Sequence, residues 1–589
     1  MSARKFSAGL PSPPSLEPSV IVIRAVAGAA GLRSSMTGSL CRTATLRKFS
    51  TRTRTIPLRN ASALRVQSRR KIMDVRYISQ SLAPSPANDA HKKAINQISG
   101  DVRRFYERKE KFRINHGSTN STRNNAKGKN IINIGGLSHV LEVNTATQTA
   151  LVEPNVPMDR LVEETLKYGL VPPVVMEFPG ITVGGGYAGT SGESSSFRHG
   201  FFNRTIKRVE MILADGQVVT CSETERPDLF HGAAGAVGSM GVTTLVELQL
   251  QPARRYVETI YHPVSGMPDA IKKIQELTQD PSIDYIDGIM FSKDRGAIIT
   301  GHLTDSSDAP VQRFSHAWDP WFYMHVDSHT QSRSSTPPRF AIPLAEYLFR
   351  YDRGGFWVGA SAFKYFSTPF NKFTRWFLDD FLHTRMMYTA LHAAGMPPNY
   401  IVQDLALPYS TATQFVDYTD SYFGIYPLWL CPLKQSPLPT MHPYNEEYEA
   451  DGKILKPLLN IGLWGYGKQH DLVTANVSLE RKLKELGGMK WLYAQTYYSE
   501  DEFWEMYDRK WYDGLREKYG ATSLPSVYEK VKAAPKAEEE GLSLLRKTLK
   551  IWPVSGFYGI WKAIQSKSYL AARASTWKDF DRRIKEKGA

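Results

Sequence analysis

Cysteine and long hydrophobic runs are both scarce in this chain of 589 residues. Its three cysteines, Cys41, Cys221 and Cys431, exclude a disulfide framework, and their wide spacing excludes an all-cysteine zinc site. The most apolar stretch, Ser19 to Leu32, is about 14 residues long and contains Arg24, so it is too short and too charged to span a bilayer. Hydrophobic residues make up 42% and charged residues 22%, which excludes a collagen-like, coiled-coil or fully disordered chain.

Acidic residues are nearly absent from the two ends of the chain. Residues 1–72 contain 14 Lys and Arg against Glu17 alone, and residues 541–589 contain 11 Lys and Arg against three acids. The net charge of +16 therefore belongs to the ends, and residues 73–540 are mildly acidic. A nucleic-acid-binding groove needs a basic stripe on the folded surface, so this distribution argues against nucleic acid as a partner.

Residues 1–72 are predicted to form a disordered basic N-terminal extension. They are rich in Ser, Thr, Arg and Pro and show no helical or strand period between Cys41 and Arg70. Two interpretations remain open. The composition resembles a mitochondrial transit peptide, or the segment is a non-native extension and Met73 is the working start.

Short strands and helices alternate in the predicted domain 77–253. A helical period covers residues 92–108, and hairpins are predicted at 139–152 and at Val209–Cys221, the latter with a two-residue turn at Asp215-Gly216. A second helix begins at Pro157 and ends before Gly169, and a strand covers Val242–Leu250. This mixture indicates an α+β domain. Cys221 and Cys431 are expected to be buried strand residues without reactive thiols.

The composition changes after Pro252. Eighteen aromatic residues lie between Phe314 and Phe377, a span of 64 residues. They are expected to form either a large aromatic core, a pocket for a large flat apolar ligand, or a surface at a membrane interface. We assign 254–480 to a substrate domain, 481–530 to a C-terminal segment returning to the first domain, and 531–589 to a basic amphipathic tail. Leu542, Trp552, Trp561 and Lys562 make that tail typical of a membrane-surface helix, although packing on the protein itself is the alternative.

Six glycines fall within residues 180–192. Such a density is interpreted as backbone that approaches a ligand and directs N–H groups at it, rather than as a packing requirement. Gly184, Gly186 and Gly189 match G-x-G-x-x-G, but no strand precedes them and no apolar helix follows, so a Rossmann domain is rejected. Two further segments, His116–Arg123 and Gly232–Gly241, combine small residues with glycines. Three such loops fit a long dinucleotide.

The order of these motifs resembles a known family. His-Gly-Ser-Thr-Asn-Ser-Thr-Arg, Pro-Gly-Ile-Thr-Val-Gly-Gly, Gly-Thr-Ser-Gly-Glu-Ser-Ser-Ser and Leu-Ala-Asp-Gly are similar to the FAD-binding domain of the vanillyl-alcohol oxidase (PCMH) type. More narrowly, Trp318-Asp319-Pro320-Trp321-Phe322, Val402-Gln403-Asp404 and Glu502-Phe503-Trp504 continue a resemblance to the delta(24)-sterol reductases over roughly residues 77–530. The resemblance implies an α+β fold, a two-part FAD-binding domain of the vanillyl-alcohol oxidase type with a separate aromatic-rich cap domain.

The resemblance also implies the cofactor and its site. FAD is expected to bind non-covalently, because the loop at His116 lacks the Gly-Gly-His motif of covalent relatives, and NADPH is the expected reductant. Animal and plant members carry an N-terminal transmembrane segment and work at the endoplasmic reticulum, whereas this chain shows no apolar run of that length. No metal site is predicted. The expected cofactor-binding residues are His116, Gly117, Ser118, Thr119, Asn120, Thr182, Val183, Gly184, Gly185, Gly186, Tyr187, Ala188, Gly189, Thr190, Ser191, Gly192, Glu193, Ser194, Gly238, Gly241 and Val242.

The implied reaction is reduction of the C24 double bond in a sterol side chain. An isolated alkene has no carbonyl to stabilise an anion, so a proton donor and a dry apolar site are needed beside the flavin. No catalytic residue is assigned. The candidate donors are Glu193, His199, Asp404, His442, Tyr466 and Tyr498. Two other functions stay open: an FAD-dependent alcohol or phenol oxidase of the same fold, and a catalytically silent scaffold.

Overall fold

The computed structural model describes residues 78–116, 130–189, 192–332, 336–394, 400–468, 471–533 and 554–579. The chain divides into two compact units, Met1–Met73 and Asp74–Ala589. The predictions for residues 1–72, for the loop residues Gly117, Ser118, Thr119 and Asn120, and for Thr190, Ser191, Leu542 and Trp552 lie outside the described residues. All that follows concerns the second unit.

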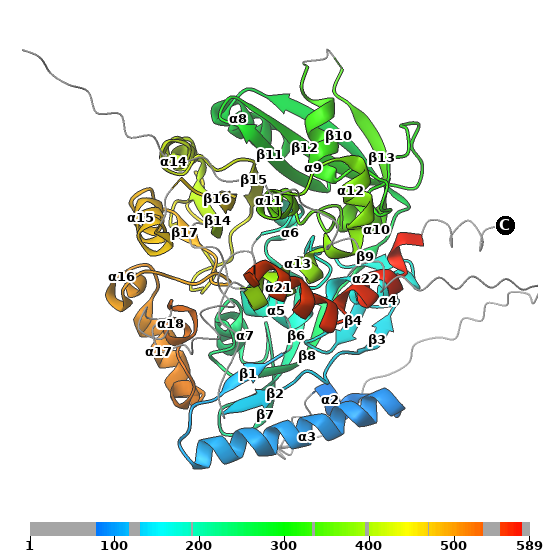
Figure 1. Cartoon of the computed structure of the whole chain (residues 1–589). Coiled ribbons are helices and arrows are strands. Elements are labelled where there is room, and N and C mark those ends of the chain that lie inside the picture. Colours follow the sequence, from blue (N-terminus) through cyan, green and yellow to red (C-terminus); the bar gives the residue numbers. More distant parts are fainter. Residues whose placement is uncertain are drawn as a thin grey trace, which may run out of the picture. The chain divides into compact units, whose positions relative to one another are not determined.

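A five-stranded antiparallel sheet forms the N-terminal part of this unit (Figure 1). Its strand order is β3-β4-β8-β6-β7. The strand bounds are β3 Val140–Asn144, β4 Thr149–Val152, β6 Ile206–Ile212, β7 Val218–Ser222 and β8 Val242–Gln249. Helix α3 (Pro86–Glu107) buries Ile95, Ile98 and Val102, and helix α4 (Met158–Leu166) buries Leu161 and Val162. Apolar residues at helical spacing thus cover the sheet.

Most local predictions for this region are confirmed. The first hairpin joins β3 to β4, and α3, α4 and β8 occupy the predicted positions. The two-residue turn at Asp215-Gly216 is wrong. Leu213 N–H bonds to Gln217 O at 2.8 Å, so three residues form the loop, and Gly216 takes the left-handed φ of 88° that closes it.

An antiparallel eight-stranded sheet forms the second layer, with strand order β13-β10-β12-β11-β15-β16-β14-β17. The bounds are β10 Tyr256–Val264, β11 Tyr285–Ser292, β12 Arg295–Thr304, β13 Arg339–Pro343, β14 Tyr400–Pro408, β15 Leu428–Leu433, β16 Leu458–Tyr466 and β17 Met489–Lys490. Helices α8 (Met267–Leu277), α14 (Tyr409–Tyr422) and α15 (Leu472–Glu485) bury Ile274, Phe415 and Leu479 against one face. Its other face joins the core of the five-stranded sheet.

These two sheets confirm the α+β class and the two-part arrangement. Three short helices that precede the tail, α16 (Glu500–Trp504), α17 (Arg509–Lys518) and α18 (Val527–Val531), return to the first layer. There Tyr512 Oη donates to Ser239 Oγ at 2.8 Å, and Lys530 Nζ donates to Gly238 O at 3.0 Å. The domain boundaries at 253, 480 and 530 stay predictions.

The aromatic block divides into a buried and an exposed half. Tyr351 stacks on Phe356 with ring centroids 3.9 Å apart, and Phe356 packs edge-on against Trp464 at 4.4 Å. These rings form the predicted aromatic core and contact one another. Helix α12 (Lys372–Phe377) instead has no buried residue, and Phe373 on it is 61% exposed.

The tail also has a buried face and an exposed face. Helix α21 (Val554–Gln565) buries Ser555, Gly556, Gly559 and Ala563. Helix α13 (Thr384–Ala394) lies against it, and a Cβ at Gly556 would approach the Phe366 ring to 2.7 Å. The small-residue face therefore packs on the protein, as the alternative predicted.

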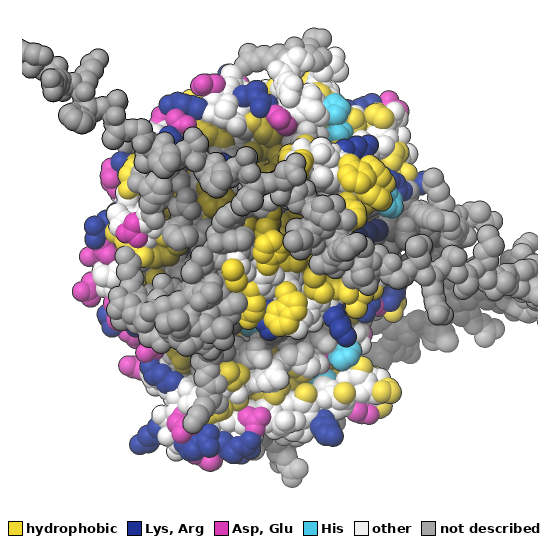
Figure 2. Space-filling model, viewed as in Figure 1, with side chains coloured by type: hydrophobic (Ala, Val, Ile, Leu, Met, Phe, Trp, Pro, Cys, Tyr) yellow, Lys and Arg dark blue, Asp and Glu magenta, His cyan; other side chains and the backbone are white. Residues whose placement is uncertain are grey.

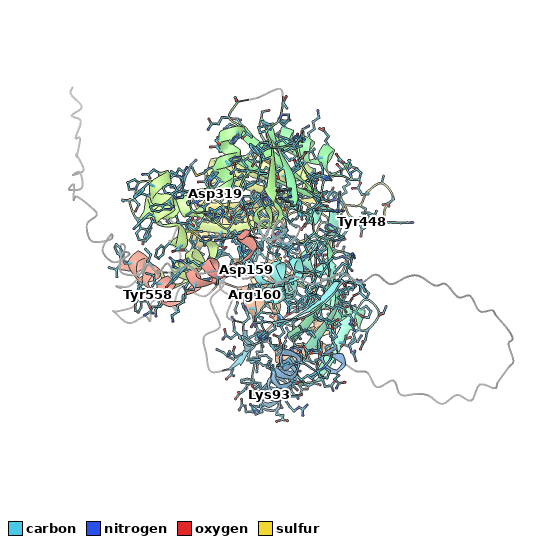
Figure 3. All side chains as sticks on the ribbon, turned by 90° about the vertical axis from the view of Figure 1, so that its right-hand side faces the viewer. Lys93, Asp159, Arg160, Asp319, Tyr448 and Tyr558 are labelled. Carbon is cyan, nitrogen blue, oxygen red and sulfur yellow. The ribbon has the colours of Figure 1, made fainter. Side chains whose placement is uncertain are left out.

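Two aromatic side chains of α21 are exposed to solvent. Phe557 and Trp561 are exposed, as are Phe373 and Phe377 of α12. Figure 2 shows hydrophobic side chains gathered over α12 and α21 on the face turned to the viewer. In Figure 3, Tyr558 of α21 lies at the edge that corresponds to this face, and Tyr448 lies on the opposite side.

Within the described ranges, no helix combines the length and the apolar character needed to cross a bilayer.

Candidate functional site

Two of the three glycine segments, 180–192 and 232–241, meet in the folded chain. Gly189, with φ 128°, lies against Gly235, so that a Cβ on Gly189 would be 3.3 Å from the Gly235 Cα. Gly238 lies against Ile114 of β1 (Arg113–Asn115), two residues before His116. Gly235 N–H bonds to Tyr187 O and Val237 N–H bonds to Ala188 O, both at 3.0 Å. The second and third segments therefore lie together, whereas the first, apart from His116, lies outside the described residues.

The glycines themselves act differently from the prediction. Residues 183–189 form helix α5, whose early N–H groups bond within the protein: Gly184 N–H donates to Pro154 O at 2.7 Å and Gly185 N–H to Thr182 Oγ1 at 3.1 Å. A Cβ on Gly184 would be 2.7 Å from Pro154 Cβ, and one on Gly186 would be 2.5 Å from the Phe202 ring. The view that these glycines serve no packing need is wrong, because close approach to neighbouring elements requires them.

The other predicted cofactor residues lie around the same convergence. Gly241 packs its Cα side against Ile212 O, Val242 begins β8 and is buried, and Thr182 forms an isolated bridge with Pro157. Val183 and Tyr187 are buried on α5, and the Tyr187 hydroxyl donates to Phe230 O at 2.9 Å. His116 directly follows β1 and is exposed. Their contact with a cofactor stays a prediction.

Residues 192–196 lie across the eight-stranded sheet. Ser194 O accepts from Ile286 N–H of β11 at 2.8 Å, and Glu193 O accepts from the Cys431 thiol of β15 at 3.1 Å. A side chain at Gly192 would collide with Leu433 of β15. The end of the glycine segment is thus held by the second layer.

Four buried carboxyl groups gather at this contact. Glu177 and Glu193 come from the glycine segment and its approach, Asp287 from β11, and Asp404 from β14. Cys431 lies among them, and burial together with these four carboxyl groups raises the pKa of its thiol well above the ordinary value. Cys431 and Cys221 are buried strand residues as predicted, and burial raises the pKa of the Cys221 thiol to about 12.

Arg350 supplies positive charge to this cluster. Its Nη2 donates to Asp287 Oδ2 at 2.9 Å and lies 3.7 Å from Glu177 Oε1. Tyr351 Oη, at 2.7 Å, and Trp429 Nε1, at 3.1 Å, donate to the same Asp287 oxygen. Asp287 Oδ1 and Arg350 Nε are buried without a hydrogen-bond partner among the described residues. Each of these two atoms is therefore available for a hydrogen bond at the contact of the two layers.

The turn after Tyr351 is strained. Gly354, Gly355 and Phe356 have φ values of 82°, 49° and 59°, and Phe356 is buried beside Tyr351 and Trp464. A bulky residue in the left-handed region costs free energy and persists where surrounding packing holds it. Tyr351, which precedes this strained turn, donates a hydrogen bond to Asp287 and so connects the turn to the carboxyl cluster.

Glu193 is a buried carboxyl group among the candidate donors. Burial raises the pKa of its carboxyl well above the ordinary value, and the charges of Glu177 and Asp404 raise it further. Asp404 accepts from Tyr493 Oη at 2.7 Å and from Asn460 Nδ2 at 3.1 Å. The structure therefore brings two of the six candidate donors together.

His442 lies beside Gly235, where the segments 180–192 and 232–241 meet. Its ring is 3.1 Å from where a Cβ on Gly235 would be, and its buried Nε2 has no hydrogen-bond partner among the described residues. Burial, with a smaller effect of Arg204, lowers the pKa of His442 to about 3, so the imidazole is neutral at pH 7. A neutral ring with a free nitrogen suits a hydrogen bond to a cofactor better than proton donation.

The remaining candidate donors lie apart from this cluster. Tyr498 Oη donates to Glu480 O at 2.5 Å, among the C-terminal helices. Tyr466 packs edge-on against Tyr400, with ring centroids 4.8 Å apart. His199 ends the short helix α6 (Ser196–His199), and burial lowers its pKa. These positions favour structural roles.

Sequence reasoning missed Glu177, Asp287 and Arg350. Each lies in a different segment, and only the pairing of β11 with the glycine segment brings them together. The signal available was weak: Asp287 and Arg350 interrupt otherwise apolar stretches, Tyr285–Phe291 and Tyr347–Tyr351.

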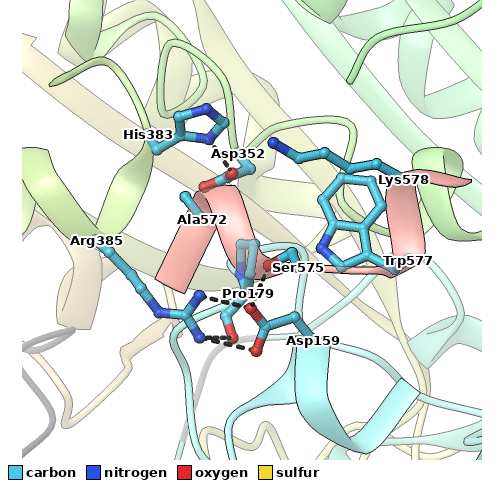
Figure 4. A pocket seen from close by; sticks show the side chains of 9 residues that line it. All are labelled: Asp159, Pro179, Asp352, His383, Arg385, Ala572, Ser575, Trp577 and Lys578. Carbon is cyan, nitrogen blue, oxygen red and sulfur yellow. Dashed lines mark hydrogen bonds and ion pairs between the residues drawn. The ribbon is translucent and has the colours of Figure 1, made fainter. Parts of the chain in front are cut away.

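A separate pocket lies where both layers meet the tail (Figure 4). Arg385 of α13 makes two hydrogen bonds to Asp159 of α4, at 2.5 and 2.8 Å. The tail contributes Ser575, Trp577 and Lys578, after helix α22 (Ser568–Ala574). Thr576 N–H bonds to Glu163, so the tail connects to α4 directly. Because Asp159 is paired with Arg385 and Asp352 with His383, this pocket serves as a junction.

Comparison with known proteins agrees with this geometry. Residues 92–222 match the family described as FAD binding domain. Delta(24)-sterol reductase from Homo sapiens is 29% identical over 459 residues, which cover 76% of this chain and 87% of that protein. Delta(24)-sterol reductase from Pisum sativum is 26% identical over 449 residues, covering 69% and 77%. Cytokinin dehydrogenase 9 from Oryza sativa subsp. japonica is 28% identical over 155 residues, or 26% of this chain.

The long matches include both sheets, whereas the match to the cytokinin dehydrogenase is confined to about a quarter of the chain. The resemblance predicted from the motifs is confirmed. The chain is thus similar to proteins named Delta(24)-sterol reductase over most of its length, and its residues 92–222 match the FAD binding domain family.

Proposed function

We propose that this protein is an FAD-dependent reductase of the C24 double bond in a sterol side chain, with NADPH as the hydride donor. One observation carries the proposal: similarity to proteins named Delta(24)-sterol reductase extends over 459 residues, far beyond the FAD-binding span 92–222. The aromatic second layer, which would contact an apolar substrate, is thus included in the similarity.

The described residues fit FAD. Two glycine segments meet at Gly189 and Gly235, and Gly238 lies against Ile114 of β1. His442, whose Nε2 has no hydrogen-bond partner among the described residues, lies beside Gly235. Residues Thr182–Ser194 and Gly235–Val242 would hold the cofactor between the layers. When bound, FAD supplies hydride transfer between the nicotinamide and the alkene. The binding is proposed to be non-covalent.

The protein's own part is to provide a proton and exclude water. Hydride addition alone to an isolated trisubstituted alkene is slow, whereas protonation of the less substituted carbon creates tertiary cation character that hydride can quench. The buried carboxyl groups at the contact of the two layers offer protons. The rings of Tyr351, Phe356 and Trp464 keep that region dry and could face developing positive charge.

The substrate class also suggests where the protein works. Sterols reside in membranes, and Phe373 and Phe377 of α12 and Trp561 of α21 are exposed. Figure 2 shows hydrophobic side chains over these two helices. Lys562 lies over the Trp561 ring at 4.7 Å, and Lys372 lies over the Trp318 ring at 5.8 Å. Exposed rings beside lysines are typical of surfaces that rest on anionic membranes. We therefore propose that α12 and α21 contact a membrane surface.

The membrane concerned is proposed to be that of the endoplasmic reticulum, by resemblance to the sterol reductases. Mitochondrial targeting by residues 1–72 is the alternative. Cell fractionation of the full chain, compared with a version that starts at Met73, distinguishes the two.

The decisive experiment follows the flavin spectrum of the full chain without oxygen. NADPH is added first and a delta(24)-sterol second. We expect the flavin band to bleach with NADPH and to recover with the sterol, with the saturated side chain as product. NADH serves as the control reductant.

Other outcomes contradict the proposal. Bleaching by an alcohol or phenol, followed by recovery only in air, would indicate an oxidase of the same fold. A purified protein without a flavin band, which also fails to take up added FAD, would indicate a scaffold.

A further inference from the structure

One face of α13 lies on the start of the glycine segment. Arg385 Nη2 donates to Pro179 O at 3.0 Å. The Tyr388 ring lies edge-on to the Phe178 ring, with centroids 6.0 Å apart. Arg385 and Tyr388 are three residues apart, so they lie on the same side of the helix. Figure 4 shows Arg385 directed at Asp159 and Pro179. Helix α13 therefore borders the glycine segment through two successive residues, 178 and 179.

Phe178 and Tyr388 belong to a group of three aromatic rings from separate segments. The Phe178 ring is also edge-on to the ring of Phe356, with centroids 5.4 Å apart. Phe356 is buried in the strained turn, whereas Phe178 and Tyr388 are half-buried. Burial raises the pKa of the Tyr388 hydroxyl, which agrees with a position inside the protein. Ring surface that the protein leaves uncovered at such a position suits an apolar ligand.

A network of charged side chains joins the strained turn to the start of α13. His383 Nδ1 lies 2.5 Å from Asp352 Oδ2, and His383 Nε2 lies 3.5 Å from Asp379 Oδ2. Arg353 Nε donates to Asp379 Oδ1 at 2.8 Å. Thr384 N–H, at the first residue of α13, donates to Asp352 Oδ1 at 3.1 Å. Residues 352 and 353 directly precede the turn, so the network fixes it relative to the helix.

The charges of this network balance. Burial lowers the pKa of His383, but attraction and hydrogen bonding to Asp352 and Asp379 outweigh it and raise the pKa to about 9. The imidazole is therefore a cation at pH 7, and Arg353 is the second cation beside the two carboxylates. Buried ions that are fully paired hold their neighbours in one arrangement, because separating them leaves an uncompensated charge.

We propose that Phe178 and Tyr388 contact the sterol, and that His383 is a positioning residue that holds Tyr388 against Phe178. This inference rests on the proposed function and names the residues that bind its substrate. Phe178 directly precedes Pro179-Gly180 of the proposed cofactor loop, so a ligand on these rings lies beside that loop. Helix α21 of the proposed membrane face lies against α13. The same helix thus borders both the sterol site and the surface at which a sterol arrives.

Tyr388→Ala tests the contact, because alanine removes the ring and keeps the helix. With desmosterol as the delta(24)-sterol, the KM is expected to rise about tenfold or more, while kcat changes by less than about threefold. Phe178→Ala should act in the same way. Binding of radiolabelled cholesterol, the saturated product, to the holoenzyme should weaken to the same extent. The affinity for FAD and flavin reduction by NADPH should stay within about twofold of wild type.

Two variants show whether the ring itself is responsible. Tyr388→Phe keeps the ring and is expected to retain the KM of wild type. Tyr418→Ala is the matched control, because Tyr418 is a half-buried tyrosine on α14 whose ring lies edge-on to Phe423, also at 6.0 Å. This contact lies on the helix-covered face of the eight-stranded sheet, so the KM should not change.

His383→Gln tests the positioning role. The KM for desmosterol is expected to rise about tenfold, with FAD affinity and flavin reduction as in wild type. His302→Gln is the control, since His302 Nδ1 lies 3.6 Å from Asp284 Oδ2 but is exposed. Thermal unfolding of each holoenzyme identifies a variant that fails to fold. In that case the two alanine variants and Tyr388→Phe decide the inference.

The outcomes separate the inference from the proposed function. Unchanged KM and cholesterol binding in both alanine variants overturn it, as does an equal loss in Tyr418→Ala or in Tyr388→Phe. A wild-type KM in folded His383→Gln overturns the positioning role. If desmosterol does not reoxidise the wild-type flavin, the proposed function fails. Binding of cholesterol to wild type and to the alanine variants then still decides whether these rings form a sterol site.

Discussion

His91 is a buried cation held between carboxylates from two different strands. Its Nδ1 lies 2.7 Å from Glu153 Oε1, beyond the end of β4, and its Nε2 lies 3.8 Å from Glu210 Oε1 of β6. Burial lowers the pKa of His91, but hydrogen bonding and attraction to the two carboxylates outweigh it and raise the pKa to about 9. The protonated ring therefore fixes α3 to the five-stranded sheet.

Replacing His91 by Gln is expected to lower the free energy of unfolding by about 3–5 kcal/mol, because two buried carboxylates lose their cation. A raised His pKa stabilises the fold fully below the ordinary value of 6.5, and the gain disappears as the pH rises through about 9. Denaturant unfolding below 6.5 and above 9 should therefore show this loss in wild type and not in the variant.

His139→Gln is the control, since His139 contacts the same Glu153 but is largely exposed. It should change stability by less than about 1 kcal/mol. An unchanged pH dependence in the His91 variant would contradict the assignment.

At the scale of elements, residues 192–196 join the two layers through one close contact. Gly192→Ala should lower the free energy of unfolding by about 1–3 kcal/mol, because the added Cβ collides with Leu433. The same change should weaken FAD binding, which is measured by the flavin fluorescence during a titration with FAD.

Leu433→Ala tests whether the collision with Leu433 causes this loss of stability. Alone it costs about 2–5 kcal/mol by leaving a cavity, but combined with Gly192→Ala the loss should be smaller than the sum of the two. Gly136→Ala is the control, because nothing lies within 4 Å of a Cβ there. Strict additivity would show that the segment does not depend on this contact.

Elements of this protein were predictable wherever the signal was local. The periods of α3 and α4 and the alternation in β8 lie within single stretches of sequence, and all three form as expected. The glycines were misinterpreted because Gly184 meets Pro154, and Gly192 meets Leu433, far along the chain. The same distance hid the cluster of Glu177, Asp287 and Arg350, because chain topology and not spacing brings them together.

At the scale of the whole molecule, the exposed rings of α12 and α21 predict binding to vesicles. The triple change of Phe373, Phe377 and Trp561 to Ser should weaken binding to vesicles with anionic lipid about tenfold or more, because partial burial of three rings is lost. Sedimentation with vesicles of phosphatidylcholine, with and without phosphatidylserine, measures this. Binding by wild type should also weaken with salt.

A control on the opposite side of the molecule uses exposed side chains of similar character. Tyr448 lies across from Tyr558 in Figure 3, and Tyr448 and Ile454 are exposed. Their change to Ser should leave vesicle binding as in wild type. Equal loss in both variants would contradict a membrane face at α12 and α21.

The contact of residues 192–196 with β11 and β15 limits how this protein can be recombined with its relatives. Ser194 and Glu193 bond to Ile286 and Cys431, while Gly192 leaves room for Leu433. A chimera cut between the two sheets at about residue 253 would place one parent's glycine segment on the other parent's strands. Such exchanges should yield folded protein only when the partners of residues 192–196 are transferred together with them.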